Sequence, residues 1–194
     1  VVTLLPGKDG RGLAVISMDW VADPRPPHPA TQGATLYIHD LAGQLLARQP
    51  LTVLHPGDAN TLGVNVYWVR SEQVTPQPIR VPRTQGIGRA SLEALLWGPV
   101  PNNLEGFQTA IPLPAEVLTA ANRGADWGER VRVMGLTIVD GVARADFSKE
   151  LLANAGDAAR MSRIRQQIEQ TLLQFSTVKQ VIITVEGQTG MLGP

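Results

Sequence analysis

The chain has 194 residues, of which 43% are hydrophobic, enough for one large or two small domains with an apolar core. Its 17 basic residues balance 17 acidic ones, which argues against the strongly basic surface that nucleic acid or an anionic membrane attracts. The lack of cysteine excludes disulfides, thiolate zinc sites and cysteine nucleophiles.

The amino-terminal end carries no signal-peptide pattern, because Pro6 and Gly7 follow Val1 closely. No apolar run approaches the roughly 20 residues that span a bilayer. Since the chain starts at a valine, we expect that a portion preceding Val1 was removed, and a signal peptide or lipid anchor there would leave no trace.

Residues 1–62 are predicted to form a small β appendage. Leu13–Trp20 favours a strand, and a proline-dense link over residues 23–29 follows it. Ala34–His39 and Leu45–Val53 indicate two strands of a hairpin around residues 42–44. The region is too short for a full sandwich domain, so it is either a partial repeat or an immunoglobulin-like fragment.

Residues 63–194 begin with two strands and a helix. Val64–Val69 is rich in β-branched and aromatic residues, which favours a strand. Three prolines interrupt Val74–Pro82, so a strand there must lie at a sheet edge. Arg89–Trp97 has helical leucine spacing, and Gly98 followed by Pro99 ends it. We expect residues 101–114 to be irregular.

A hairpin is the clearest local signal in the sequence. Val131–Val139 and Val142–Phe147 alternate in polarity and flank Asp140-Gly141. Asp-Gly between two such strands favours a type I′ turn, because glycine accepts the positive φ that this turn requires.

The carboxyl-terminal part predicts a short turn, a long helix and a last strand. Ser148 is positioned to cap Lys149–Leu152, and Asp157 to cap a helix over Ala158–Phe175. The apolar stripe of that helix leaves Arg160, Arg163 and Gln167 outside it; its members are Met161, Ile164, Ile168 and Leu172. With a strand at Val178–Val185, the order predicts an α+β fold: a mixed β-sheet with two helices packed on one face.

Six stretches follow one another as in a known family. They are Val66 to Trp68, Pro78 to Arg83, Ala90 to Pro99 with its Leu-Leu-x-Gly-Pro ending, Gly106 with Ala110-Ile111-Pro112, Leu136 to Ser148, and Thr171 to Val181. Together they resemble the GerMN domain family, the sporulation and spore germination domain, over about Val64 to Pro194.

The resemblance implies a small α+β fold like that of the ring-building domains of secretion machines. It also implies a location outside the cytoplasmic membrane, often as a lipoprotein, and a role without known catalysis in spore formation, germination or envelope signalling. We therefore expect envelope or sporulation proteins as partners, with self-assembly as a further expectation. Membrane contact would run only through a removed anchor.

Candidate catalytic groups are few. His28, His39 and His55 all precede residue 63, at spacings unsuited to a helical zinc pair, so we interpret them as surface residues. The stretch from Gly86 to Ser91 resembles part of a dinucleotide loop, but serine replaces its third glycine. We interpret it as an ordinary helix start and predict no catalytic, cofactor-binding or metal-binding residues.

The remaining polar candidates also have structural interpretations. Asp140 belongs to the hairpin turn, and Asp146 is expected to cap the following turn. Trp97 and Phe175 are predicted to lie in the core. Arg160 and Arg163 share one solvated helix face and are the candidate partner-binding residues.

These observations favour a non-catalytic interaction module. Two alternatives stay open: a module that binds a small ligand or cell-wall glycan where the two regions meet, and a hydrolase that uses His39 or His55 across that junction.

Overall fold

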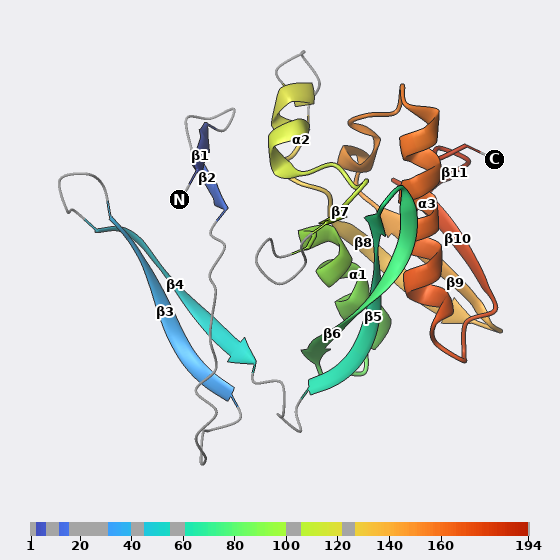
Figure 1. The fold of residues 1–194 in the computed structure, drawn as a ribbon, viewed down its shortest axis with the longest axis horizontal. Coiled ribbons are helices and arrows are strands. Elements are labelled where there is room, and N and C mark those ends of the chain that lie inside the picture. Colours follow the sequence, from blue (N-terminus) through green and yellow to red (C-terminus); the bar gives the residue numbers. More distant parts are fainter. Residues whose placement is uncertain are drawn as a thin grey trace.

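A computed structural model describes residues 3–6, 12–15, 31–39, 45–54, 61–99, 106–121 and 127–193, with side chains for 61–99, 106–120 and 127–193. The amino-terminal third contributes two antiparallel strand pairs (Figure 1). Their members are β1 (Thr3–Pro6) with β2 (Gly12–Val15), and β3 (Thr31–His39) with β4 (Leu45–Leu54).

The pairing of β3 with β4 confirms the predicted hairpin, whose turn at residues 42–44 lies outside the described residues. The strand predicted over Leu13–Trp20 coincides with β2 as far as Val15, and its remainder also lies outside them. The division of the chain after residue 62 stays a prediction.

Residues 61–193, the main body of the domain, contain two sheets, and one of them has three strands in the order β6-β5-β7. They are β5 (Thr61–Arg70), β6 (Gln73–Pro82) and the short β7 (Phe107–Gln108). β6 lies at an edge, as predicted. Its prolines occupy alternate positions whose backbone nitrogen faces away from β5. Because no hydrogen bond to β5 is made there, the lack of an N–H group costs none.

The second sheet is mixed and has four strands in the order β11-β10-β9-β8. They are β8 (Val133–Val139), β9 (Val142–Phe147), β10 (Gln180–Val185) and β11 (Gln188–Thr189). β9 is antiparallel to β8 and parallel to β10. Asp140 and Gly141 have φ of 49° and 81°, which confirms the predicted type I′ turn.

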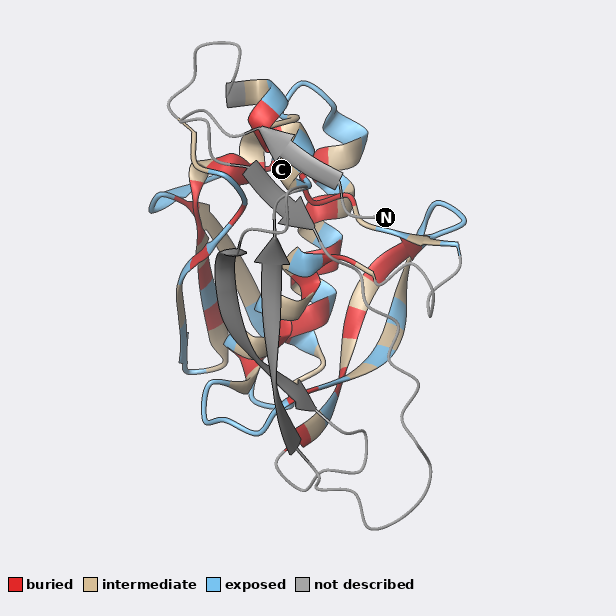
Figure 2. Cartoon of the chain, turned by 90° about the vertical axis from the view of Figure 1, so that its left-hand side faces the viewer, coloured by how far each residue is buried: buried red, intermediate tan, exposed pale blue. Residues whose placement is uncertain are grey.

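Helices lie between the two sheets (Figure 1). α1 (Ile87–Trp97) and α3 (Ala158–Leu173) contact each other, β5 of the three-stranded sheet, and β8 and β10 respectively of the four-stranded sheet. Buried positions concentrate on the faces that these layers turn toward one another (Figure 2). The predicted α+β class is confirmed, with β5 and β6 in a sheet of their own.

The local signals of α3 and α1 behave as the sequence predicts. Asp157 accepts a hydrogen bond from the Arg160 N–H (2.9 Å) and caps α3, whose predicted apolar stripe is buried. Gly98 ends α1 with φ of 75°. No helix within the described ranges is long and apolar enough to cross a membrane.

Two elements between residues 106 and 152 differ from the prediction. Residues 101–114 were expected to be irregular, yet they contain β7 and the first residue of α2 (Pro114–Ala121), a helix that the apolar periodicity does not reveal. Ser148 precedes the 3₁₀ turn η1 (Lys149–Leu152), but its side chain does not cap that turn. Its Oγ instead accepts a hydrogen bond from the Arg132 N–H at 3.0 Å.

Polar side chains of α3, and that of Gln174 directly after it, complete the edge of β5 that β7 leaves open. Gln174 Oε1 accepts from the Asn65 N–H and Gln174 Nε2 donates to the Asn65 carbonyl oxygen, both at 2.7 Å. Gln167 Nε2 donates to the Tyr67 carbonyl oxygen at 2.9 Å. Thr171 Oγ1 accepts from the Tyr67 N–H at 3.3 Å. Spaced i, i+4 and i+7, these side chains stand where a neighbouring strand would bond.

Candidate functional site

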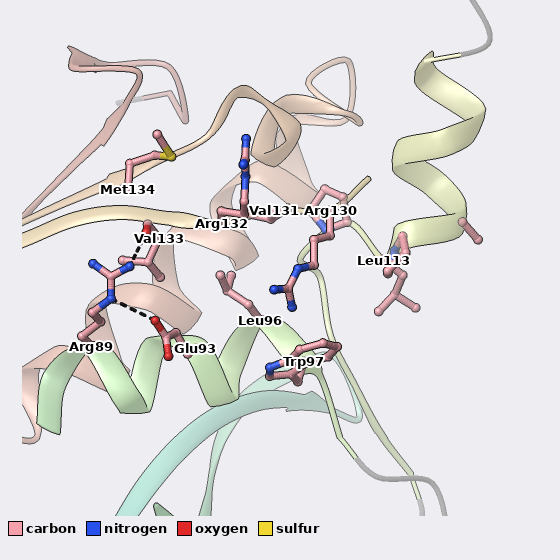
Figure 3. A pocket seen from close by; sticks show the side chains of 13 residues that line it. Arg89, Glu93, Leu96, Trp97, Leu113, Arg130, Val131, Arg132, Val133 and Met134 are labelled. Atoms are coloured by element: carbon pink, nitrogen blue, oxygen red, sulfur yellow. Dashed lines mark hydrogen bonds and ion pairs between the residues drawn. The ribbon is translucent and has the colours of Figure 1, made fainter. Parts of the chain in front are cut away.

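A surface groove of about 640 Å³ lies between α1, the start of α2 and the start of β8 (Figure 3). Its lining is mainly apolar, with four charged side chains. The residues are Arg89, Glu93, Leu96, Trp97, Pro112, Leu113, Pro114, Ala115, Arg130, Val131, Arg132, Val133 and Met134. Apolar ligands and peptide side chains are typical occupants of such hollows.

The floor of the groove is the solvent-facing side of α1. Leu92 and Leu95 are fully buried and point into the core. Trp97 follows Leu95 by two positions, about 200° around the helix, and 66% of its surface is exposed. The prediction that Trp97 lies in the core is therefore wrong. Leu113 and Met134, at the other two sides, are 42% and 54% exposed.

The charges along the groove are predominantly positive. Arg89 Nε pairs with Glu93 Oε1 at 2.9 Å, and its Nη2 donates to the Val133 carbonyl oxygen at 2.9 Å, which joins α1 to β8. The Arg130 guanidinium lies 4.4 Å from the centre of the Trp97 ring. Figure 3 shows it directed from the β8 side toward Trp97, across the hollow.

A buried carboxylate holds the wall that leads into β8. Glu150 is 1% exposed, and its Oε1 accepts from the Gly128 N–H at 2.5 Å. Burial raises the pKa of this carboxyl. Hydrogen bonds from Ser148 and from the Gly128 and Glu150 backbone, together with the charge of Arg132, lower the pKa by more than burial raises it. The net pKa is therefore below the usual range. The carboxylate of Glu150 thus holds the backbone of Gly128, in the segment that leads into β8.

A second carboxylate holds the opposite wall. Glu116 accepts two hydrogen bonds from Arg160, at 2.6 and 2.8 Å, and one from the Leu113 N–H at 2.9 Å. The latter contact closes the first turn of α2. The Arg160 hydrogen bonds lower the pKa of Glu116 by more than its burial raises it. Arg160 Nε also donates to the Ala110 carbonyl oxygen (2.7 Å), so α2 is tied to α3.

The two predicted partner-binding arginines have different surroundings. Arg160 is directed inward and positions one wall of the groove. Arg163 lies on the surface and pairs with Glu72 in the turn between β5 and β6. The structure does not bring either residue into the lining of the groove. Their role toward a partner stays a prediction.

The other sequence candidates have the following positions. His28 and His55 lie outside the described residues, and His39 is described only as backbone of β3. Asp146 Oδ1 accepts from Thr184 Oγ1 (2.7 Å) and from the Gly187 N–H (2.9 Å), so it fixes the β10–β11 turn rather than capping η1.

The glycine-rich stretch also has a structural place. Gly86 is the N-cap of α1, and Gly88 is buried where a Cβ would stand 3.1 Å from Leu136, so the stretch is an ordinary helix start. Within the described part of the chain, no group of three or more histidine or acidic side chains is placed to hold a metal ion.

The fold and the groove together define an α+β domain with an apolar, positively flanked surface site. The chain belongs to the Germane family, described as sporulation and spore germination, whose model matches residues 65–190. The predicted resemblance to the GerMN family is thereby confirmed.

Three solved structures are similar to the chain at low sequence identity. The tandem GerMN domains of the sporulation protein GerM from Bacillus subtilis align with a TM-score of 0.50 and 23% identity, over 66% of this chain and 40% of that one. The first GerMN domain of the same protein gives 0.49 and 23%, over 66% and 85%. A Clostridium perfringens protein, provisionally described as a lipoprotein, gives 0.42 and 20%, over 69% and 79%. No curated protein is significantly similar to the chain.

Proposed function

We propose that this protein is a non-catalytic, extracytoplasmic interaction module of the bacterial cell envelope, which docks with other envelope or sporulation proteins through the groove beside α1. Residues 63–194 form the GerMN-like domain in this proposal, and residues 1–62 are an appendage to it. Membership of a family described by sporulation and germination supports the setting. A membrane-anchored, lipoprotein-like location rests on the same resemblance.

The groove carries the docking role. Trp97, Leu113 and Met134 are large apolar side chains exposed by 66%, 42% and 54%, and they line one continuous hollow. Contiguous exposed apolar surface on a small domain is costly in water and marks interaction sites. An aromatic residue combined with arginines is also the composition of interface hot spots.

Site-specific photo-crosslinking in the producing bacterium tests the proposal. A benzophenone side chain placed at position 97 should crosslink to an envelope protein, and the same group at position 144 on β9 should not, because Arg144 is exposed on the far face of the four-stranded sheet. Equal crosslinking from both positions, or none from position 97, would contradict docking at the groove.

A turnover assay tests the absence of catalysis. Peptidoglycan fragments and simple esters should be left unchanged by the purified chain. Hydrolysis that a single substitution within residues 61–193 abolishes would overturn the non-catalytic assignment.

A small-ligand role is the second candidate. The volume of about 640 Å³ and the apolar lining fall within the range of ligand pockets, which is the observation that favours it. Screening by thermal shift would separate the two roles: a compound that raises the melting temperature of the wild type but not of Leu113→Gln supports ligand binding. Leu113 is suitable because it is half exposed and lines the groove.

A further inference from the structure

The outer edge of β8 is an open strand edge among the residues that the structure describes. β8 ends the sheet order β11-β10-β9-β8. Val139 and Val142 flank the two-residue turn, so they form a hydrogen-bonded pair. Alternation then directs the N–H and C=O groups of Leu136 and Ile138 away from β9, toward the open side.

Within the two sheets formed by residues 61–189, the β8 edge lacks the protection that the other outer strands have. The β6 edge carries prolines at positions 76, 78 and 82, and β11 has only two residues. β8, in contrast, contains neither proline nor charge, and Met134, Ile138 and Val139 are 54%, 41% and 64% exposed. Natural proteins usually block such an edge against pairing with another chain.

The open edge continues directly into the groove. Val133 and Met134 at the start of β8 line the hollow, and Arg89 occupies the carbonyl oxygen of Val133 where edge and groove meet. A strand laid along Leu136 and Ile138 would therefore pass Arg89 and bring its next residues over Leu96 and Trp97. Successive residues of such an extended segment lie about 3.3 Å apart along the strand.

The charge of the groove indicates the chemistry of that segment. Three arginines and one glutamate line it, and the glutamate is already paired with Arg89. No ion pair between described residues involves Arg130, whose guanidinium is held over Trp97 at 4.4 Å. A carboxylate from a bound segment would meet Arg130 without displacing any carboxylate of the described residues.

We propose that β8 and the groove bind an extended, acidic and apolar segment of a partner protein. The segment adds a strand to β8, places an apolar side chain against Trp97 and sets a carboxylate on Arg130. This inference rests on the proposed docking function and specifies the class of partner.

Selection from a random octapeptide display library, with the purified 194-residue chain as bait, tests the inference. Enriched peptides should combine Asp or Glu with aliphatic or aromatic residues. Arg130→Ala and Trp97→Ala should each weaken their binding about tenfold or more. Arg144→Ala, which removes the same charge from the far face, should leave it unchanged.

Two further measurements separate the parts of the inference. Arg130→Glu as bait should shift the enriched peptides from acidic to basic, and an unchanged preference would overturn the carboxylate contact. N-methylation of alternate residues in a selected peptide should abolish binding, because it removes the N–H donors that β8 requires. Tolerance of N-methylation at every position would overturn strand addition.

The outcomes also distinguish this inference from the docking function itself. If no enriched peptide depends on Trp97, docking at the groove fails together with the inference. If Trp97-dependent peptides are neither acidic nor extended, only the inference fails. A wild-type dimer in sedimentation velocity that Ile138→Lys dissociates would overturn the inference by assigning the edge to a second copy of the chain.

Discussion

Gln167 is the side chain whose substitution tests how α3 is joined to β5 and to the segment that contains Ala110. It is fully buried, and its amide bridges two backbone groups: Nε2 donates to the Tyr67 carbonyl oxygen at 2.9 Å, and Oε1 accepts from the Ala110 N–H at 2.8 Å. Gln167→Leu keeps the approximate volume and removes both bonds. The two backbone groups would then remain buried without a partner.

The expected cost follows from those two orphaned groups. Each unsatisfied buried backbone group costs about 1–3 kcal/mol, and the added apolar surface of leucine offsets part of the sum. We expect the free energy of unfolding to fall by about 2–5 kcal/mol. Gln170→Leu makes the same chemical change at an exposed position of the same helix and should stay within about 0.5 kcal/mol.

Urea unfolding followed by tryptophan fluorescence measures these differences. Gln174→Leu provides an intermediate case, since Gln174 is half-buried and water can reach the freed groups of Asn65. The expected order of loss is therefore Gln167, then Gln174, then Gln170. A Gln167→Leu variant within about 1 kcal/mol of the wild type, at an unchanged urea dependence, would refute the assignment of these contacts as structural.

Three further changes should have the following effects. Glu72→Gly should raise the free energy of unfolding by about 0.5–1 kcal/mol in the same assay. Glu72 has φ of 66°, which glycine adopts without strain, and its exposed ion pair with Arg163 contributes little. A lower free energy of unfolding would contradict strain at this position. Since the pKa values of Glu116 and Glu150 are lowered in the folded state, their contribution is present above the ordinary value of 4.5 and should be lost as pH falls below it. Glu150→Gln should flatten that acid dependence in urea titrations between pH 6 and pH 3, and an unchanged slope would contradict it. Arg160→Lys should lower the free energy of unfolding by about 1 kcal/mol, because lysine cannot form the bidentate contact with Glu116. An unchanged melting temperature in calorimetry would show that this contact does not contribute to stability.

The parts of the fold that the sequence predicts are those with a local cause. Asp140-Gly141 requires positive φ at both positions, and the structure has it. The prolines of β6 permit only an edge position. The apolar stripe of α3 faces the core because helical spacing alone determines it. Each of these signals acts within a few residues.

Other elements lack a local signal of that strength. The turn between β5 and β6 has φ of 49° at Ser71 and 66° at Glu72, a type I′ geometry without glycine or asparagine, so the strands on both sides must impose it. α2 is a short helix whose only signals are Pro114 at its first position and Glu116 at its third. Recognising that pair would have predicted α2.

The groove was not predictable because it depends on tertiary placement. Trp97 is apolar and close to the core leucines in sequence, yet the helix turns it outward, and only the return of residues 130–134 past α1 makes a hollow there. Arg130 becomes notable for the same reason, since 33 positions separate it from the ring that it covers. Neither residue stands out in the sequence pattern.

α3 both completes the edge of β5 and holds one wall of the groove. α3 holds both backbone groups of Ala110: Gln167 accepts from its N–H at 2.8 Å, and Arg160 donates to its carbonyl oxygen at 2.7 Å. Ala110 leads into Pro112 and Leu113, which form one side of the groove. Arg160 also binds Glu116, which fixes the first turn of α2 behind that side. Gln167, one of the polar residues that take the place of a strand beside β5, therefore also helps to set the position of one groove wall. A change at Gln167 should consequently weaken peptide binding in the groove even though Gln167 does not line it.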